Sequence, residues 1–121
     1  RRAGLPPWPY DFIGDPTLPL DAEAIRKVVF GRSLQGMTLP DKSPFFEEIK
    51  GTGAFARRDR SALLTGTVLL IGDMLCHRIP ARLLGRDNCG YVYRNSGGSA
   101  AGHDQYIYVN ATSVSYFSPL Q

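Results

Sequence analysis

Two cysteines and two histidines are the residues best suited to hold a metal ion in this chain of 121 residues. Thiolates and imidazoles are the usual ligands of structural zinc, but such sites draw ligand pairs from one tight turn. Cys76, His77, Cys89 and His103 contain neither a C-x-x-C nor an H-x-x-x-H spacing. Neighbouring residues of a strand also point to opposite faces, so if Cys76 faces the core, His77 faces outward. We therefore expect no metal site, no cofactor and no Cys-His catalytic pair.

Other combinations with catalytic potential are equally disfavoured. Glu47 and Glu48 are adjacent on an expected strand and face opposite ways, which argues against the paired carboxylates of a glycosidase. His103 and Asp104 would form an acid/base couple only if a nearby serine folded back onto them. The sequence therefore favours a protein that is not an enzyme, with a small hydrolase that uses the 95–104 loop as the weaker alternative.

Four tyrosines at alternate positions of two expected strands form the candidate binding surface. Tyr91 and Tyr93 lie on one strand, and Tyr106 and Tyr108 lie on the next, with aliphatic residues between them. If these strands form a hairpin, the four rings share the face that points away from the aliphatic core. Arg94 ends the first strand and can donate bidentate hydrogen bonds. We expect this surface to bind a protein partner or a small anionic or aromatic ligand.

A competing explanation for the tyrosines is internal burial. Prolines forbid helix and remove hydrogen-bond donors, so the proline-rich residues 1–20 should form an extended arm. Trp8 and Tyr10 of this arm can lie across the four tyrosines. The sequence leaves open whether the tyrosine face is open or covered.

The basic residues do not have the pattern of a nucleic-acid surface. The 14 lysines and arginines exceed the 11 aspartates and glutamates by three, and the arginines are spread along the chain rather than clustered with aromatic residues. We therefore expect no nucleic-acid partner. The densest group, Arg57, Arg58 and Arg60, is expected in a hairpin loop, either as a solvated turn or as a weak docking site for an anion or acidic partner.

One helix and a series of short strands must position these residues. Residues 21–30 are expected to form the helix, because Asp21 suits the N-cap and Gly31 suits the end. Leu20 and Ile25 have the spacing of a hydrophobic staple. Short apolar stretches separated by turn residues then predict strands at Ser33–Leu39, Phe45–Ile49, Gly53–Arg57, Ala62–Ile71, Met74–Ile79, Cys89–Arg94, Gln105–Asn110 and Ser113–Phe117.

This pattern predicts a mainly β fold, an antiparallel meander or small β-barrel of seven or eight strands with one N-terminal helix. The length suits one domain, residues 21–121, behind the arm. Gly66 within the long strand suggests a bulge or bend. The longest aliphatic run, Val68–Ile71, is far shorter than the roughly 20 residues of a membrane helix, so no transmembrane segment is expected within this chain.

Cys76 and Cys89 enclose twelve residues. In a cytosolic protein they would be two buried thiols, whereas in an exported protein they would form a bridge between neighbouring strands. The bridge is the favoured alternative and would stabilise the fold by roughly 3 kcal/mol. The chain begins without Met, which suits a mature, trimmed or excised domain whose signal peptide would lie upstream.

Several short motifs carry a resemblance to a known group of proteins. They are a short helix followed by Phe30-Gly31-Arg32-Ser33-Leu34-Gln35-Gly36, a strand ending in Gly72-Asp73-Met74-Leu75-Cys76, a second cysteine and an aromatic strand. With these motifs, the stretch from Asp21 to Phe117 resembles a loose family of small exported β-domains of alphaproteobacteria, mostly without assigned function. Some members are appended to larger periplasmic or membrane-anchored proteins, including signalling proteins.

This resemblance implies a periplasmic or secreted location and supports the disulfide. It also implies a non-catalytic binding or sensory accessory domain, with a structural or protein-interaction domain as the alternative.

Overall fold

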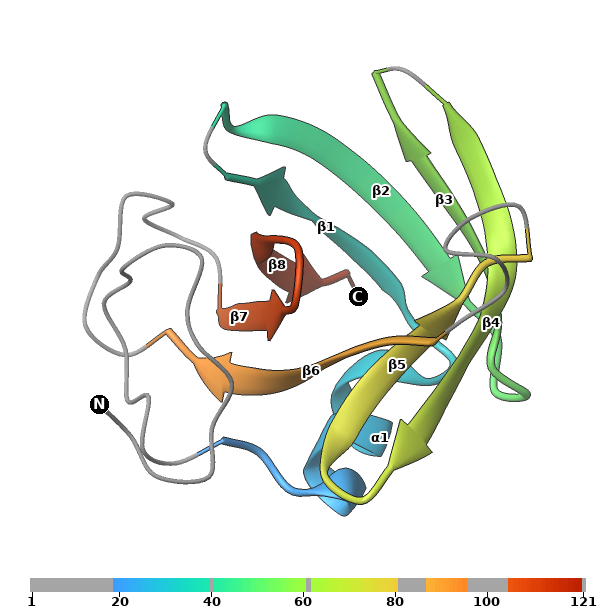
Figure 1. Ribbon diagram of the computed structural model, residues 1–121, viewed down its shortest axis with the longest axis vertical. Helices are drawn as coiled ribbons and strands as arrows, with labels where there is room; N and C mark the ends of the chain where they lie inside the picture. Colours follow the sequence, from blue (N-terminus) through green and yellow to red (C-terminus); the bar gives the residue numbers. More distant parts are fainter. Residues whose placement is uncertain (1–18, 40, 61, 81–86, 96–104, 121) are drawn as a thin grey trace.

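The fold is a closed antiparallel β-barrel with one helix before its first strand (Figure 1). The computed structural model describes residues 19–39, 41–60, 62–80, 87–95 and 105–120. These ranges contain the helix α1 (Ala22–Val29) and the strands β1 (Ser33–Thr38), β2 (Ser43–Ile49), β3 (Ala54–Asp59), β4 (Leu63–Ile71), β5 (Met74–Arg78), β6 (Asp87–Arg94), β7 (Tyr106–Asn110) and β8 (Val114–Pro119). Each strand pairs with the next and β8 pairs with β1, which confirms the predicted small barrel.

The eight predicted strands are all present, with ends shifted by one or two residues at most. In β2 the agreement follows from a regular alternation, because Phe45, Glu47 and Ile49 are buried and the residues between them are exposed. Gly72 adopts the positive φ of 59° that the short turn between β4 and β5 requires.

The beginning of α1 is determined by two carboxylates. Asp21 is the N-cap, and its carboxylate accepts the N–H of Ala24 at 2.9 Å. Asp73, in the turn between β4 and β5, accepts the N–H of Ala22 at 2.9 Å. Leu20 and Ile25 are both buried, as the staple predicts. The first turn of the helix is therefore held by its own cap and also by the barrel.

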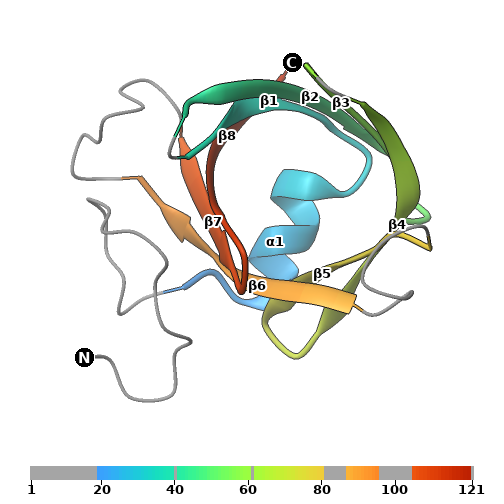
Figure 2. The ribbon, with the colours of Figure 1, turned by 45° about the horizontal axis from the view of Figure 1, so that its top comes forward.

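The helix closes one end of the barrel. Figure 2 shows α1 within the ring of strands. Ile25 and Val29, on one face of the helix, are fully buried. They belong to one hydrophobic core with side chains that the strands contribute, namely Leu34, Phe45, Ile49, Phe55, Val68, Leu75, Val92, Tyr108 and Phe117. This end of the lumen is thus filled by side chains, as is common in barrels of this size.

Cys76 and Cys89 form the predicted disulfide. They lie directly opposite each other in β5 and β6, with their Cα atoms 4.0 Å apart. Cys76 and His77 face opposite ways, as expected of strand neighbours, but it is Cys76 that lies on the outer face, while His77 shares the inner face of β5 with the core residue Leu75. His77 therefore points into the barrel.

Candidate functional site

A polar cavity of about 390 Å³ occupies the end of the barrel opposite α1. We call it the cup. Most of its side chains carry hydroxyl, amide or charged groups, and those described are Thr38, Asp41, Ser43, Arg57, Asp59, His77, Ile79, Asn88, Tyr108, Asn110, Thr112, Ser113 and Ser115. The cup is the candidate binding site.

The cup arises because the inward positions of several strands change from apolar to polar along the barrel. In β1 and β8, the apolar residues Leu34 and Phe117 lie toward α1, while Thr38 and Ser115 lie opposite each other at the far end. The hydroxyl oxygens of these two residues are 3.3 Å apart. The lumen is therefore divided along its axis into a packed apolar half and a polar half.

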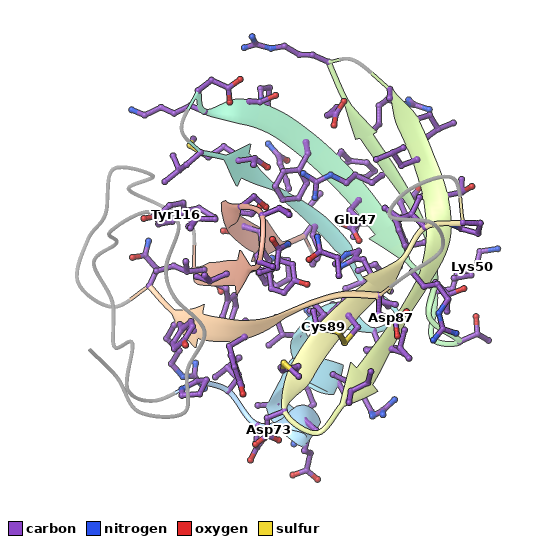
Figure 3. The ribbon with its side chains drawn as sticks, viewed as in Figure 1. Glu47, Lys50, Asp73, Asp87, Cys89 and Tyr116 are labelled. Atoms are coloured by element: carbon purple, nitrogen blue, oxygen red, sulfur yellow. A yellow bond between two sulfur atoms is a disulfide. The ribbon has the colours of Figure 1, made fainter. Side chains whose placement is uncertain are left out.

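Four side chains lie at the boundary between the cup and the apolar core, and we call them the floor. They are Glu47 of β2, Arg57 of β3, His77 of β5 and Tyr108 of β7. Glu47 is 2% exposed, and Figure 3 shows it within the ring of strands. Its Oε2 is 3.0 Å from Nε2 of His77, and its Oε1 is 3.6 Å from Nη1 of Arg57. The pair of Glu47 and His77 thus bridges the lumen between non-neighbouring strands.

Arg57 is held by three contacts. Its guanidinium lies 3.9 Å from the centre of the Phe45 ring, a cation–π arrangement. Its Nη2 donates to the hydroxyl of Thr38 at 3.0 Å, and it pairs with Glu47. The guanidinium of Arg57 therefore already has an anionic partner, a hydrogen-bond acceptor and an aromatic ring within the protein.

The carboxyl of Glu47 is stabilised in its ionised form. Burial raises the pKa of Glu47, but the attraction and hydrogen bonds of His77 and Arg57 outweigh burial and leave this pKa below its ordinary value. Tyr108 behaves differently, because burial raises the pKa of its hydroxyl, which stays protonated. That hydroxyl donates to the carbonyl oxygen of Leu75 at 2.7 Å and lies 3.4 Å from Nδ1 of His77.

The structure does not bring the four predicted tyrosines to one face. Tyr91 pairs with Val109, whereas Tyr108 pairs with Val92. Directly paired residues share a face, so Tyr91 and Tyr93 point away from the lumen while Tyr106 and Tyr108 point toward it. The expected tyrosine patch was wrong because the register of β6 and β7 differs by one residue from the one that would align the rings.

The predicted ligand-binding residues are accordingly dispersed. Tyr108 lines the cup, but Tyr106 and Arg94 pair with each other at the end of the barrel near α1. Tyr93 is buried in a second cluster, which lies on the outer side of β6, β7 and β8 and includes Tyr116 (Figure 3). Trp8 and Tyr10, the expected cover of the tyrosines, lie outside the described residues.

The arginine group does not form one docking surface. Arg57 and Arg58 belong to β3 rather than to a hairpin loop, because β3 remains paired with β2 as far as Asp59. Arg57 enters the cup, while Arg58 and Arg60 are exposed. The histidine and aspartate of the predicted 95–104 loop, His103 and Asp104, lie outside the described residues.

The Glu47–His77 pair is not among the sites expected from the sequence, although a signal for it exists there. Glu47 stands between Phe45 and Ile49 in the alternation of β2, and His77 continues the inward row that begins at Leu75. A charged residue at an apolar position of an alternating strand is expected to be buried with a partner. The identity of the partner requires the closed barrel.

No group of three or more His, Cys, Asp or Glu side chains is placed to hold a metal ion in the described ranges. Nor do these ranges contain a helix of the length and hydrophobicity needed to cross a membrane. No protein-family model, curated protein or solved structure matches the chain. The resemblance to exported alphaproteobacterial domains therefore stays a prediction.

Proposed function

We propose that the chain is a non-catalytic binding or sensory domain that holds a small polar ligand in the cup. The observation that carries this proposal is the division of the lumen into a filled half and a polar cavity of about 390 Å³. Closed barrels of eight strands are either filled by side chains or hold one small ligand. A concave site with convergent polar groups is the usual form of a ligand site.

The pairing of charges in the floor favours binding over catalysis. Arg57 and His77 share Glu47, and Tyr108 donates to a backbone carbonyl. Such contacts fix the side chains in place and suit a rigid wall for a ligand. This preorganisation favours the binding of a polar ligand, because the side chains lose their conformational entropy during folding rather than on binding.

The disulfide supports a location outside the cytoplasm. Disulfides persist in oxidising compartments such as the periplasm and the extracellular space. We therefore place the domain in the periplasm or among secreted proteins, as the resemblance also implies. A larger exported or membrane-anchored protein would be the natural context for such a module.

The proposal is tested by screening the full chain against a library of small polar molecules, with thermal shift and ligand-observed NMR as readouts. Thr38→Phe should fill the cup and abolish binding. Thr65→Phe is the matched control, since Thr65 is an exposed strand residue on the outer side of β4. A ligand at one hundred times its Kd should stabilise the fold by about 2.7 kcal/mol.

Two results would overturn the proposal. One is a library without any ligand, in which case the structural or protein-interaction alternative takes its place. The other is a ligand that binds the Thr38→Phe variant as well as it binds the unchanged chain, because such a ligand would occupy a different site.

A further inference from the structure

We propose that the ligand of the cup is a small, uncharged polyhydroxylated molecule, of the class of polyols and monosaccharides. This inference rests on the proposed function and specifies the chemistry of the same site. It is drawn from the donors, acceptors and charges that the cup presents.

The cup offers donors and acceptors together. Asp41 and Asp59 contribute carboxylates, Arg57 contributes a guanidinium, and most of the other described lining residues contribute hydroxyl or amide groups. An anion needs donors, and an ammonium group needs acceptors, whereas a hydroxyl group donates and accepts at once. A lining of this mixed kind matches a ligand that carries several hydroxyl groups.

The charges of the cup argue against an anionic ligand. Arg57 is the obvious anion-binding group, but it already pairs with Glu47, donates to Thr38 and stacks on Phe45. The carboxylates of Asp41 and Asp59 lie in the same cavity and would repel an anion. The small anionic ligand expected from the sequence is therefore not the class that this cavity favours.

His77 can form a hydrogen bond with a ligand hydroxyl through Nδ1. The ionised carboxylate of Glu47 accepts from Nε2, so Nδ1 can accept from a ligand hydroxyl when the ring is neutral and can donate to it when the ring is charged. The proton of the Tyr108 hydroxyl is directed to the carbonyl of Leu75 at 2.7 Å, and this hydroxyl is 3.4 Å from Nδ1. The contact of Nδ1 with Tyr108 is thus long, and His77 lines the cup, where a ligand hydroxyl can approach Nδ1 more closely.

Thr38 and Ser115 add an adaptable pair of hydroxyls. Their oxygens are 3.3 Å apart, and either can donate to the other. The pair can therefore present a donor or an acceptor to a ligand, as the ligand requires.

The size and polarity of the cup restrict the ligand further. Its volume of about 390 Å³ is near the lower end of the roughly 300–1,000 Å³ typical of small-molecule pockets. Ile79 is the sole aliphatic side chain among its described lining residues. A compact polar molecule is favoured over a fatty or extended aromatic one.

The test measures binding of a fixed panel to the full chain by isothermal titration and ligand-observed NMR. The uncharged probes are myo-inositol, D-glucose and D-ribose, the anionic probes are D-gluconate and D-glucose 6-phosphate, and the cationic probe is D-glucosamine. We expect at least one uncharged probe to bind, and each charged probe to bind at least tenfold more weakly than it.

Variants of the cup tie this binding to the named hydroxyls. Thr38→Val keeps the shape of the side chain but removes its hydroxyl, and should weaken binding about tenfold, the effect of one lost hydrogen bond. Thr65→Val on the outer side of β4 is the matched control and should leave binding unchanged. Ser115→Ala is a second variant, to be used if Thr38→Val does not fold, as judged by circular dichroism.

The outcomes separate the ligand class from the proposed function. Tightest binding by an anionic or cationic probe, abolished by Thr38→Phe, would overturn the polyhydroxylated class but keep the cup as a ligand site. If no probe of the panel binds but another molecule of the library does, the polyhydroxylated class is likewise overturned and the cup is kept as a ligand site. Failure of both the panel and the library would overturn both, as would polyol binding that Thr38→Phe does not affect.

Discussion

Replacing Glu47 by glutamine removes the negative charge that His77 and Arg57 share, while the size of the side chain is kept. The buried partners then lose their ionic acceptor, so we expect the free energy of unfolding to fall by about 1–3 kcal/mol. Urea denaturation followed by circular dichroism at pH 7 measures this change.

Glu48→Gln is the matched control, because Glu48 is the adjacent glutamate and is exposed on the outer side of β2. Its effect should stay within about 0.5 kcal/mol, as for most surface substitutions. Equal losses for the two variants would contradict the role of the floor.

The stability of the fold should also decline in acid through Glu47. The pKa of Glu47 is lower in the folded chain than in the unfolded chain, so between these two values the unfolded chain binds the extra proton. Its stabilising contribution is complete above the unfolded pKa of about 4.3 and is lost as the pH falls through the folded pKa. The stability difference between the wild type and Glu47→Gln should therefore shrink from pH 6 to pH 3.

Denaturation curves at several pH values test this expectation. Asp87 also has a lowered pKa, owing to its hydrogen bond with Arg78, so the wild-type curve alone does not isolate Glu47. The Glu47→Gln comparison does, because Asp87 is common to both proteins. A difference that stays constant down to pH 3 would contradict the assignment.

At the scale of single elements, α1 depends on a hydrogen bond from outside the helix. Asp73→Ala removes the acceptor of the Ala22 N–H and should lower the free energy of unfolding by about 1 kcal/mol, the usual value for a lost cap. Asp21→Ala, which removes the N-cap, should have a similar cost. Both are measured by chemical denaturation, with the exposed Lys50→Ala as a control. A loss below about 0.3 kcal/mol for Asp73→Ala would show that the barrel does not help to cap the helix.

The disulfide joins β5 and β6 at directly opposed positions. Its removal frees the loop between the two strands in the unfolded chain, so Cys76→Ala/Cys89→Ala should cost roughly 3 kcal/mol. The same loss should follow reduction of the wild type, and the double variant should not respond to reductant. Thiol titration of the unfolded, unreduced protein should find no free thiol, and two reactive thiols would contradict the bridge.

At the scale of the whole molecule, closure of the barrel requires the strands to approach closely at certain inward positions. A Cβ atom at Gly66 would overlap the carbonyl oxygen of Arg78 and lie 3.0 Å from the Phe55 ring. Gly66→Ala should therefore destabilise the fold by about 1–3 kcal/mol. Gly51→Ala is the control, since nothing lies within 4 Å of a Cβ atom there. Equal stability of the two variants, measured by thermal and urea unfolding, would contradict this role of Gly66.

The sequence by itself determined where the helix begins and where the strands lie. Asp21 and the staple of Leu20 and Ile25 fixed where α1 begins, since capping is local to a few residues. The alternation of apolar residues located the strands to within one or two residues, because that period is a property of each strand alone. The places of Cys76 and Cys89 in consecutive strands favoured a bridge over two free thiols, and the structure contains that bridge.

The tertiary structure decided which side chains meet. A period of two residues does not tell which set faces the lumen, so the alternation alone left open whether Cys76 or His77 points inward. A register change of one residue separated Tyr91 and Tyr93 from Tyr106 and Tyr108. The contact between Glu47 and His77 joins β2 with β5 across the lumen, and it exists because the sheet closes on itself, a property that no local pattern encodes.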